Sequence, residues 1–169
     1  RGEVVRASAL PADGGGTRAG PIGTPVNPGH LAVSTTWKVE GSPYKVKGEV
    51  FIDPGVNLTI EGGTSVWFDI GAKLTVDGRL ISNGSVLNRV TFTSSQAQPS
   101  TNDWKGIWVS TTGSANFTYS NVHFSKSGIN VTGGQATVSN STLSFHQLSA
   151  LRAGVGANVT VKDCIIASC

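Results

Sequence analysis

A repeat of eight residues runs through residues 46–93 and constrains the fold of this chain more than any other feature. In five of the six octads two apolar residues flank one other residue, as in a strand that buries one face. Glycine recurs at one position of successive octads, at Gly55, Gly63 and Gly71. The repeat therefore predicts short strands joined by tight turns. Its apolar pairs are Val50/Ile52, Leu58/Ile60, Val66/Phe68, Leu74/Val76 and Val90/Phe92.

Strands this short cannot bury a face alone, so successive octads must stack on one another. Three octads make one coil, which places Ile52 against Val76 and Phe68 against Phe92. The chain is therefore predicted to be all-β. Its architecture is expected to be a right-handed parallel β-helix, a three-faced solenoid of about five coils.

The later coils are less regular, with spacings that fall short of three octads after a loop at 95–103. With an allowance for this loop, Phe92 is expected to stack on Phe124, and Phe145 is expected to point inward. Polar residues that tolerate a left-handed backbone are expected to form a column at one turn. This column consists of Asn121, Asn140 and Asp163.

Within this pattern lie the sequences SPY (42–44), GVNLTIEGGT (55–64), VTFTS (90–94) and WKGI (104–107). They resemble the repeats of right-handed parallel β-helix proteins of bacterial, archaeal and some animal cell surfaces, which share the shape of the pectate-lyase-like superfamily. The resemblance covers residues 37–169. It implies the fold strongly and the function weakly, because such repeats occur both in surface and adhesion proteins without known catalysis and in polysaccharide enzymes.

The beginning of the chain has a different composition. Residues 11–30 contain six glycines and four prolines, which disfavour a helix or a central strand. We therefore expect an extended arm over residues 1–35, with a possible donor strand at 3–10, followed by the β-helix at 36–169.

The strongest catalytic candidates are Asp53 and Asp77, which are three octads apart in the sequence and so stack one coil apart. Two carboxyl groups about 5 Å apart could serve a glycosidase as nucleophile and acid. An aspartate that ends each strand can equally accept hydrogen bonds from turn amides. The second interpretation is favoured, so no catalytic residue, metal or cofactor is expected.

Trp67 and Trp108 stand between inward residues of their strands and are expected to project outward. An outward tryptophan can stack on a sugar ring or on another subunit. Alternatively, the arm or the loop at 95–103 covers these rings.

Asparagines in Asn-x-Ser/Thr triplets are the candidate glycosylation sites. Asn57, Asn116 and Asn158 are expected to share one outward position, whereas Asn140 belongs to the turn column and is not expected to carry a glycan. Polar residues are also common at outward positions without modification. The predicted glycosylation sites are Asn57, Asn83, Asn116, Asn130 and Asn158.

Charge and cysteine content bear on location and partners. The basic residues are scattered and the net charge is only +3, which argues against nucleic-acid binding. The sequence contains no apolar run long enough for a transmembrane helix, so membrane insertion is not expected. The chain lacks methionine and begins at Arg1, so we expect an exported protein whose signal peptide has been removed. Cys164 and Cys169 could pair with each other, pair between molecules or stay reduced, and a local disulfide is favoured.

These features together predict a non-catalytic extracellular structural protein. Because a parallel solenoid exposes strand edges at its ends, copies could stack head to tail into a filament or surface array, with exchange of the arm. The alternatives are a carbohydrate-binding or polysaccharide-degrading β-helix, or part of a larger surface adhesin.

Overall fold

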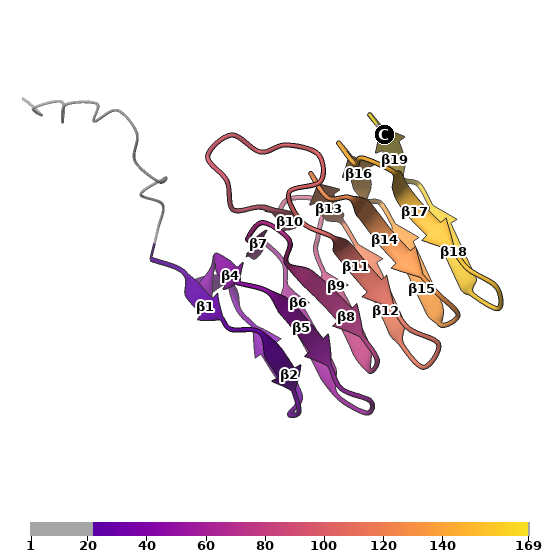
Figure 1. The fold of residues 1–169 in the computed structure, drawn as a ribbon, viewed down its shortest axis with the longest axis horizontal. Coiled ribbons are helices and arrows are strands. Elements are labelled where there is room, and N and C mark those ends of the chain that lie inside the picture. The colour runs from indigo at the N-terminus through magenta and orange to yellow at the C-terminus, as the bar shows by residue number, and fades with distance from the viewer. Residues whose placement is uncertain (1–21, 169) are drawn as a thin grey trace, which may run out of the picture.

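The computed structural model describes residues 22–168, in which short strands form three parallel sheets wound into a solenoid (Figure 1). Sheet A consists of β1 (Thr24–Val26), β4 (Tyr44–Val46), β7 (Ser65–Phe68), β10 (Val90–Ser94), β13 (Ser120–His123), β16 (Thr142–Ser144) and β19 (Ile165–Ala167). Sheet B consists of β2 (Gly29–Leu31), β5 (Glu49–Ile52), β8 (Lys73–Val76), β11 (Gly106–Val109), β14 (Ser127–Val131) and β17 (Ser149–Ala153). Sheet C consists of β3 (Thr35–Trp37), β6 (Asn57–Glu61), β9 (Arg79–Asn83), β12 (Ser114–Thr118), β15 (Gln135–Ser139) and β18 (Asn158–Lys162).

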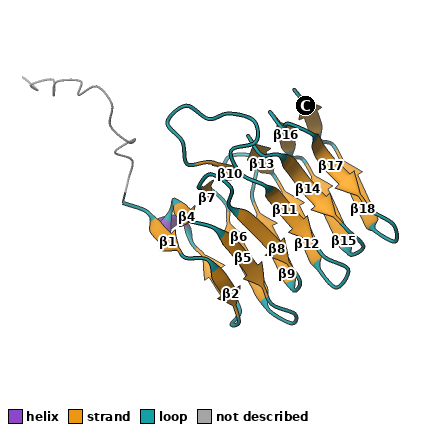
Figure 2. Ribbon diagram, viewed as in Figure 1, coloured by secondary structure: helices purple, strands orange, loops and turns teal. Residues whose placement is uncertain are grey.

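The described residues make about six coils, each with one strand in each sheet, so the predicted all-β parallel β-helix is confirmed. Figure 2 shows how little helix interrupts the strands, and the helical turn η1 (Val39–Gly41) is short. Within residues 22–168 no helix is long and apolar enough to cross a membrane.

The first coil comprises β1, β2 and β3 and occupies residues 24–37, most of which the composition assigns to the arm at 1–35. Strand β1 lies at the end of sheet A, where Pro25 pairs with Lys45. An end strand accepts proline because the missing N–H is not required by a further neighbour. The described coils therefore begin at Thr24 rather than at residue 36, and the expected donor strand at 3–10 lies outside the described residues.

The interior is a mainly apolar column formed by the inward residues of successive coils. The octad repeat predicts these inward positions correctly in the first coils, where Val50, Ile52, Leu74 and Val76 are fully or almost fully buried. Ile52 pairs with Val76, as a coil of three octads predicts. Burial of such side chains is the main stabilising contribution in a solenoid with few long-range contacts beyond its neighbouring coils.

The predicted register fails at the next coil of sheet A. Phe68 pairs with Ser94, and Phe92 pairs with Val66 rather than with Phe68. The turn at 84–89 is longer than the preceding turns of the repeat, so this coil exceeds three octads and the pairing shifts by two positions. Because the shift is an even number, the inward residues remain inward.

The shift continues into the following coil, where Phe92 pairs with Val122 and not with Phe124. Phe124 and Phe145 adopt left-handed backbone angles, with φ of 61° and 59°, and their rings stack on each other at 5.1 Å. They therefore form a corner instead of pointing into the core as expected. Trp104 fills the interior here, fully buried and stacked on Phe68 at 3.9 Å.

The predicted column of polar turn residues is correct in part. Asn140 and Asp163 have left-handed φ angles of 51° and 52° at equivalent turns, but the equivalent residue of the coil before is Tyr119, with φ of 44°. Asn121 lies two residues further along, in β13, where its Oδ1 accepts a hydrogen bond from Arg89 Nε at 2.9 Å. The irregular coil length caused this error as well.

Candidate functional site

Trp67 and Trp108 project outward from two adjacent sheets. Trp67 lies on β7 in sheet A, where it pairs with Lys45. Trp108 lies on β11 in sheet B, between Thr75 and Asn130 in the outward ladder. Both tryptophans are half-buried although their neighbours along the strand are fully buried.

Trp108 lines a cavity of about 450 Å³ on sheet B, within the size range of small-ligand sites. Lys105, Lys126 and Arg152 line the same cavity and come from three successive coils. Among the described residues that line it there is no carboxylate. The local charge is therefore positive and favours an anionic ligand.

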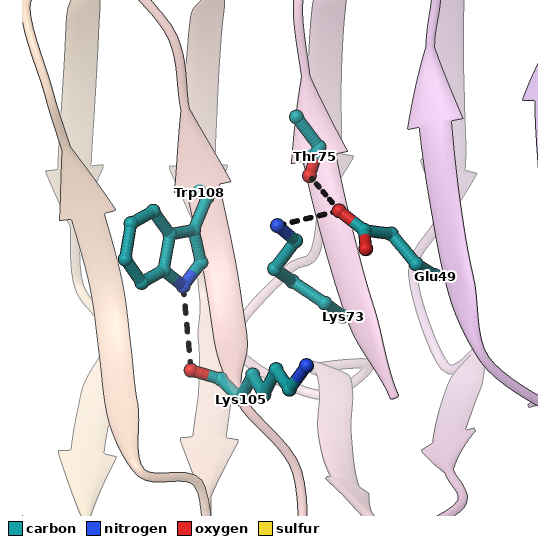
Figure 3. A network of polar contacts seen from close by, with 5 residues as sticks. All are labelled: Glu49, Lys73, Thr75, Lys105 and Trp108. Carbon is teal, nitrogen blue, oxygen red and sulfur yellow. Dashed lines mark hydrogen bonds and ion pairs between the residues drawn. The ribbon is translucent and has the colours of Figure 1, made fainter. Parts of the chain in front are cut away.

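The Trp108 indole is bonded to the residue directly before β11 and lies beside an ion pair (Figure 3). Its Nε1 donates a hydrogen bond to the Lys105 carbonyl oxygen at 3.4 Å. The Lys73 ammonium lies 5.4 Å from the ring centroid and 2.5 Å from the Glu49 carboxylate, which also accepts a bond from Thr75 Oγ1 at 3.5 Å. Since the indole N–H already has an acceptor, a ligand would meet this ring through its flat surface.

Trp67 lines a second cavity, of about 620 Å³, on sheet A. Lys45 and Lys47 line it too, and the Lys45 ammonium lies 5.8 Å from the Trp67 ring centroid. The carboxylate in this lining belongs to Asp69, whose Oδ1 accepts a hydrogen bond from Ser95 Oγ at 2.7 Å. This second cavity thus repeats the combination of an aromatic ring with cationic side chains.

The loop at 95–103 connects β10 of sheet A to β11 of sheet B and borders both cavities. Its first residues line the cavity of Trp67 and Asn102 lines the cavity of Trp108. The loop is fixed at its end by Asp103, which accepts a bond from Ser94 Oγ at 2.6 Å and, through its carbonyl, from the Gly71 N–H at 2.7 Å. The loop therefore forms part of the wall of both cavities, and both rings stay half-buried.

Asp53 and Asp77 follow β5 and β8 at one corner, and their strands pair so that they lie one coil apart, as predicted. Asp53 Oδ1 lies 2.6 Å from His30 Nδ1, and the Asp77 N–H donates to the Ile52 carbonyl at 3.0 Å. Neither carboxylate lines the two tryptophan cavities. The Asp53 carboxylate thus contacts a histidine of the first coil, and among residues 22–168 no turn amide donates to either carboxylate, so the expected turn bonds are not found. Among residues 22–168 no group of three His, Cys, Asp or Glu side chains is placed to hold a metal ion.

The asparagines of the predicted glycosylation sites differ in exposure. Asn57, Asn83 and Asn158 are exposed and Asn116 is half-buried. Asn130 is only 4% exposed, because it lies beside Trp108 in sheet B. A glycan at Asn130 would have to displace these neighbours, so the three exposed asparagines remain the best candidates.

The expected alignment of three glycosylation sites is wrong for one of them. Asn57 and Asn158 occupy the same position in sheet C, through the pairing of β6, β9, β12, β15 and β18. Asn116 lies two residues further along and pairs with Ile81 and Thr137. The long coil between β9 and β12, which contains the turn at 84–89 and the loop at 95–103, separates Asn116 from the regular spacing of the repeat.

Cys164 is half-buried at the edge of the core, and its thiol donates to the Val138 carbonyl oxygen at 3.3 Å. Its predicted partner, Cys169, lies outside the described residues. The disulfide therefore stays a prediction.

Two serine–histidine pairs lie in the last coils. His146 is buried, with its Nδ1 2.8 Å from Ser125 Oγ, and its Nε2 has no hydrogen-bond partner among the described residues. Burial lowers the pKa of His146 to about 4, and the nearby His123 adds to the shift. Burial also lowers the pKa of His123, whose Nδ1 lies 2.8 Å from Ser144 Oγ. Because Ser125 and His146 are both buried, this pair stabilises the interior and is not positioned to attack a substrate.

The cationic side chains around Trp108 were not predicted as site residues. The spacing between Lys105 and Lys126 matches the shorter spacing of the later coils, so the repeat could have revealed that they stack. Arg152 belongs to the outward ladder of Trp108 and pairs with Asn130.

The family model of the pectate-lyase-like β-helix domain matches residues 29–156, which is most of the described solenoid. The chain belongs to this family. No curated protein and no solved structure matches the chain. Membership among the pectate-lyase-like β-helices identifies the architecture, and the family includes enzymes, so function must be argued from the site itself.

Proposed function

We propose that this pectate-lyase-like β-helix is a non-catalytic extracellular module that binds an acidic polysaccharide on sheet B. The observation that carries the proposal is the cavity of Trp108, in which an indole ring is surrounded by Lys105, Lys126 and Arg152 without a lining carboxylate among the described residues.

The chemistry of such a site matches an acidic sugar chain. The apolar face of a sugar ring packs on an indole, while its carboxylate or sulfate groups form charge-assisted hydrogen bonds with Lys and Arg. The three cationic side chains come from successive coils, which lie ~4.8 Å apart along the solenoid. This rise is close to the length of one sugar residue, so two acidic groups of one chain could meet Lys105 and Lys126, which lie one coil apart directly before β11 and β14. Arg152 lies further along sheet B, in the ladder of Trp108 and Asn130, where it could meet a third acidic group.

Calorimetric titration with hexagalacturonate tests this proposal, with maltohexaose as a neutral oligosaccharide of equal length. We expect binding of the acidic oligosaccharide alone. Trp108→Ala and Arg152→Ala should each weaken binding about tenfold, equivalent to ~1.4 kcal/mol. Lys162→Ala, which removes an exposed charge from sheet C, is the matched control and should change little.

Three outcomes would overturn the proposal. One is the absence of binding to hexagalacturonate, and another is equal affinity for maltohexaose. The third is equally tight binding of oligothymidylate, because a basic cavity with an aromatic ring also suits single-stranded nucleic acid.

A second candidate function is assembly of copies end to end into a filament or surface array. It is favoured by apolar side chains on the last described coil, where Val155, Ile165 and Ile166 are 100%, 63% and 52% exposed. At the other end, Val26 and Leu31 line a cavity of about 560 Å³. Strands β17, β18 and β19 of one copy could pair with β2, β3 and β1 of the next, which would cover both surfaces.

Sedimentation velocity over a range of concentrations tests assembly. The chain should form larger species as concentration rises, and Ile165→Lys should keep it monomeric because a charge would be buried at the contact. Deletion of residues 1–21 tests whether copies exchange the arm. If they do, the shortened chain should assemble less readily than the full chain. A monomer at every concentration would contradict this second function.

The extracellular location and the glycans are tested by the intact mass of the chain from its native source. We expect added glycan mass that peptide mapping assigns to Asn57, Asn83 or Asn158. An unmodified chain would contradict the glycosylation sites.

A further inference from the structure

The two tryptophan cavities adjoin each other across the edge between sheets A and B. Ile70, in the turn between β7 and β8, lines both cavities and is 71% exposed. The loop at 95–103 also borders both. The surfaces around Trp67 and Trp108 are therefore continuous over this edge, and an apolar side chain lies at their border.

We propose that Trp67 and Trp108 are two subsites for one acidic glycan chain, which crosses the edge between sheets A and B over Ile70. This inference rests on the proposed function of the Trp108 cavity and extends it to a second face of the solenoid. It also requires that the acidic polysaccharide be flexible enough to bend over this edge.

The charges of the two cavities favour one polyanion. Lys45 and Lys47 line the cavity on sheet A, in addition to the three cationic side chains on sheet B. The opposing carboxylate, Asp69, is engaged by the Ser95 hydroxyl at 2.7 Å and helps to hold the loop at 95–103. A polyanion that reaches both cavities would therefore find cationic side chains at each end of its path.

The border between the subsites suits a sugar chain as well. The exposed Ile70 side chain offers an apolar contact for the C–H face of the sugar that passes over the edge. The bonds of Asp103 to Ser94 and to Gly71 fix the loop beside this path. A surface held in this way loses little conformational entropy when the ligand binds.

Two linked subsites make affinity depend on ligand length. A short oligosaccharide can occupy only one cavity, whereas a longer one occupies both, and the second contact forms at a high effective concentration. A dodecamer of galacturonate can place several different stretches on one site, which gives it a statistical gain in affinity over a trimer. We expect the dodecamer to bind at least tenfold more tightly than the trimer beyond this statistical gain. The dodecamer should bind with one site per chain.

The experiment is calorimetric titration of trimer and dodecamer into the full chain and its variants. Trp67→Ala and the double variant Lys45→Ala/Lys47→Ala should weaken dodecamer binding about tenfold and leave trimer binding at the Trp108 cavity unchanged. Ile70→Glu should also weaken the dodecamer selectively, through charge repulsion at the border. Lys162→Ala is the control, and urea unfolding of each variant verifies that it is folded.

The outcomes separate this inference from the proposed function. If the trimer binds at Trp108 but the dodecamer gains nothing from Trp67, Lys45 and Lys47, the second subsite is disproved and the Trp108 site stands. If Trp67→Ala weakens trimer and dodecamer equally, the two cavities are not successive subsites, and the inference fails. If neither oligosaccharide binds, the proposed function fails and this inference fails with it.

Discussion

At the two corners beside sheet A, the first coils and the last coils turn the chain with different residues. Gly63 and Gly71, on either side of β7, have φ angles of 85° and 77°, which glycine adopts without steric cost. In the last coils, non-glycine residues at both ends of the sheet A strands have left-handed backbone angles, with φ of 44° to 61°. They are Tyr119, Phe124, Asn140, Phe145, Asp163 and Ser168. The same architecture thus tolerates strained corners where neighbouring coils supply compensating contacts.

The interiors of the two regions differ as well. The inward side chains of β5, β6, β7 and β8 are apolar, and their contribution comes from burial. In the last coils several polar side chains are buried and bonded to the next coil: Ser120, Ser125, Ser141, Ser144 and His146. Buried polar pairs stabilise the fold only while their hydrogen-bond geometry and protonation states are kept. The stability of the last coils should therefore be more sensitive to substitutions and to pH than that of the first coils.

Gly106→Ala should have the largest effect. An added Cβ would overlap the Ser127 carbonyl oxygen of the next coil, and the φ of Gly106 is 110°. We expect a loss of roughly 3 kcal/mol or more in the free energy of unfolding, measured with urea. Gly55→Ala is the matched control, because its Cβ would meet nothing within 4 Å, and only its φ of 80° costs about 1 kcal/mol. If Gly106→Ala and Gly55→Ala lost the same free energy of unfolding, the proposed difference between the first and the last coils would be contradicted.

Acid should destabilise the chain through His146. Because burial lowers the pKa of His146 to about 4, the unfolded chain, with its ordinary pKa near 6.5, binds this proton more readily. Stability is complete above pH 6.5 and falls as the pH drops toward 4, by about 3 kcal/mol in total.

His146→Gln should remove most of this pH dependence, as measured by urea unfolding at several pH values. His30→Gln, on the exposed histidine of the first coil, should retain it. If His146→Gln unfolds with the pH profile of the unmodified chain, the buried histidine is not the group responsible.

Arg89 should stabilise the last coils by joining them to the coil before. Its guanidinium donates to the Asn140 carbonyl at 2.8 Å and to Asn121 Oδ1 at 2.9 Å. We expect Arg89→Met to cost about 2 kcal/mol in the free energy of unfolding. Arg89→Lys should cost nearly as much, because an ammonium cannot reproduce the forked geometry. Arg79→Met on the surface of sheet C is the control. If it lowered the free energy of unfolding as much as Arg89→Met, the effect would come from the positive charge and not from the hydrogen bonds of Arg89.

The sequence predicted the architecture and the outward direction of both tryptophans, because apolar alternation is independent of coil length. It did not predict the register after Phe68, since the turn at 84–89 and the loop at 95–103 change the coil length without changing the alternation. Phe124 was assigned to the core because hydrophobicity does not reveal a left-handed backbone. Among the cations around Trp108, Lys105 and Lys126 have the spacing of the later coils, which the sequence analysis did not use. The place of Arg152 beside Asn130 depends on turn lengths that the structure supplies.

Phe145→Asn should have the smallest effect and isolates the cost of a corner in the last coils. Phe145 has a φ of 59° and is 45% exposed, and it stacks on Phe124 at 5.1 Å. Loss of this stack should cost about 1 kcal/mol, whereas asparagine relieves much of the left-handed strain that phenylalanine bears. The two effects should nearly cancel, with a net change below about 0.5 kcal/mol in urea unfolding. Phe145→Ala loses the stack without the relief that asparagine gives, so it should be less stable than Phe145→Asn. If the two variants unfold alike, the left-handed corner carries no measurable strain, and the contrast with the glycine corners of the first coils lies in packing alone.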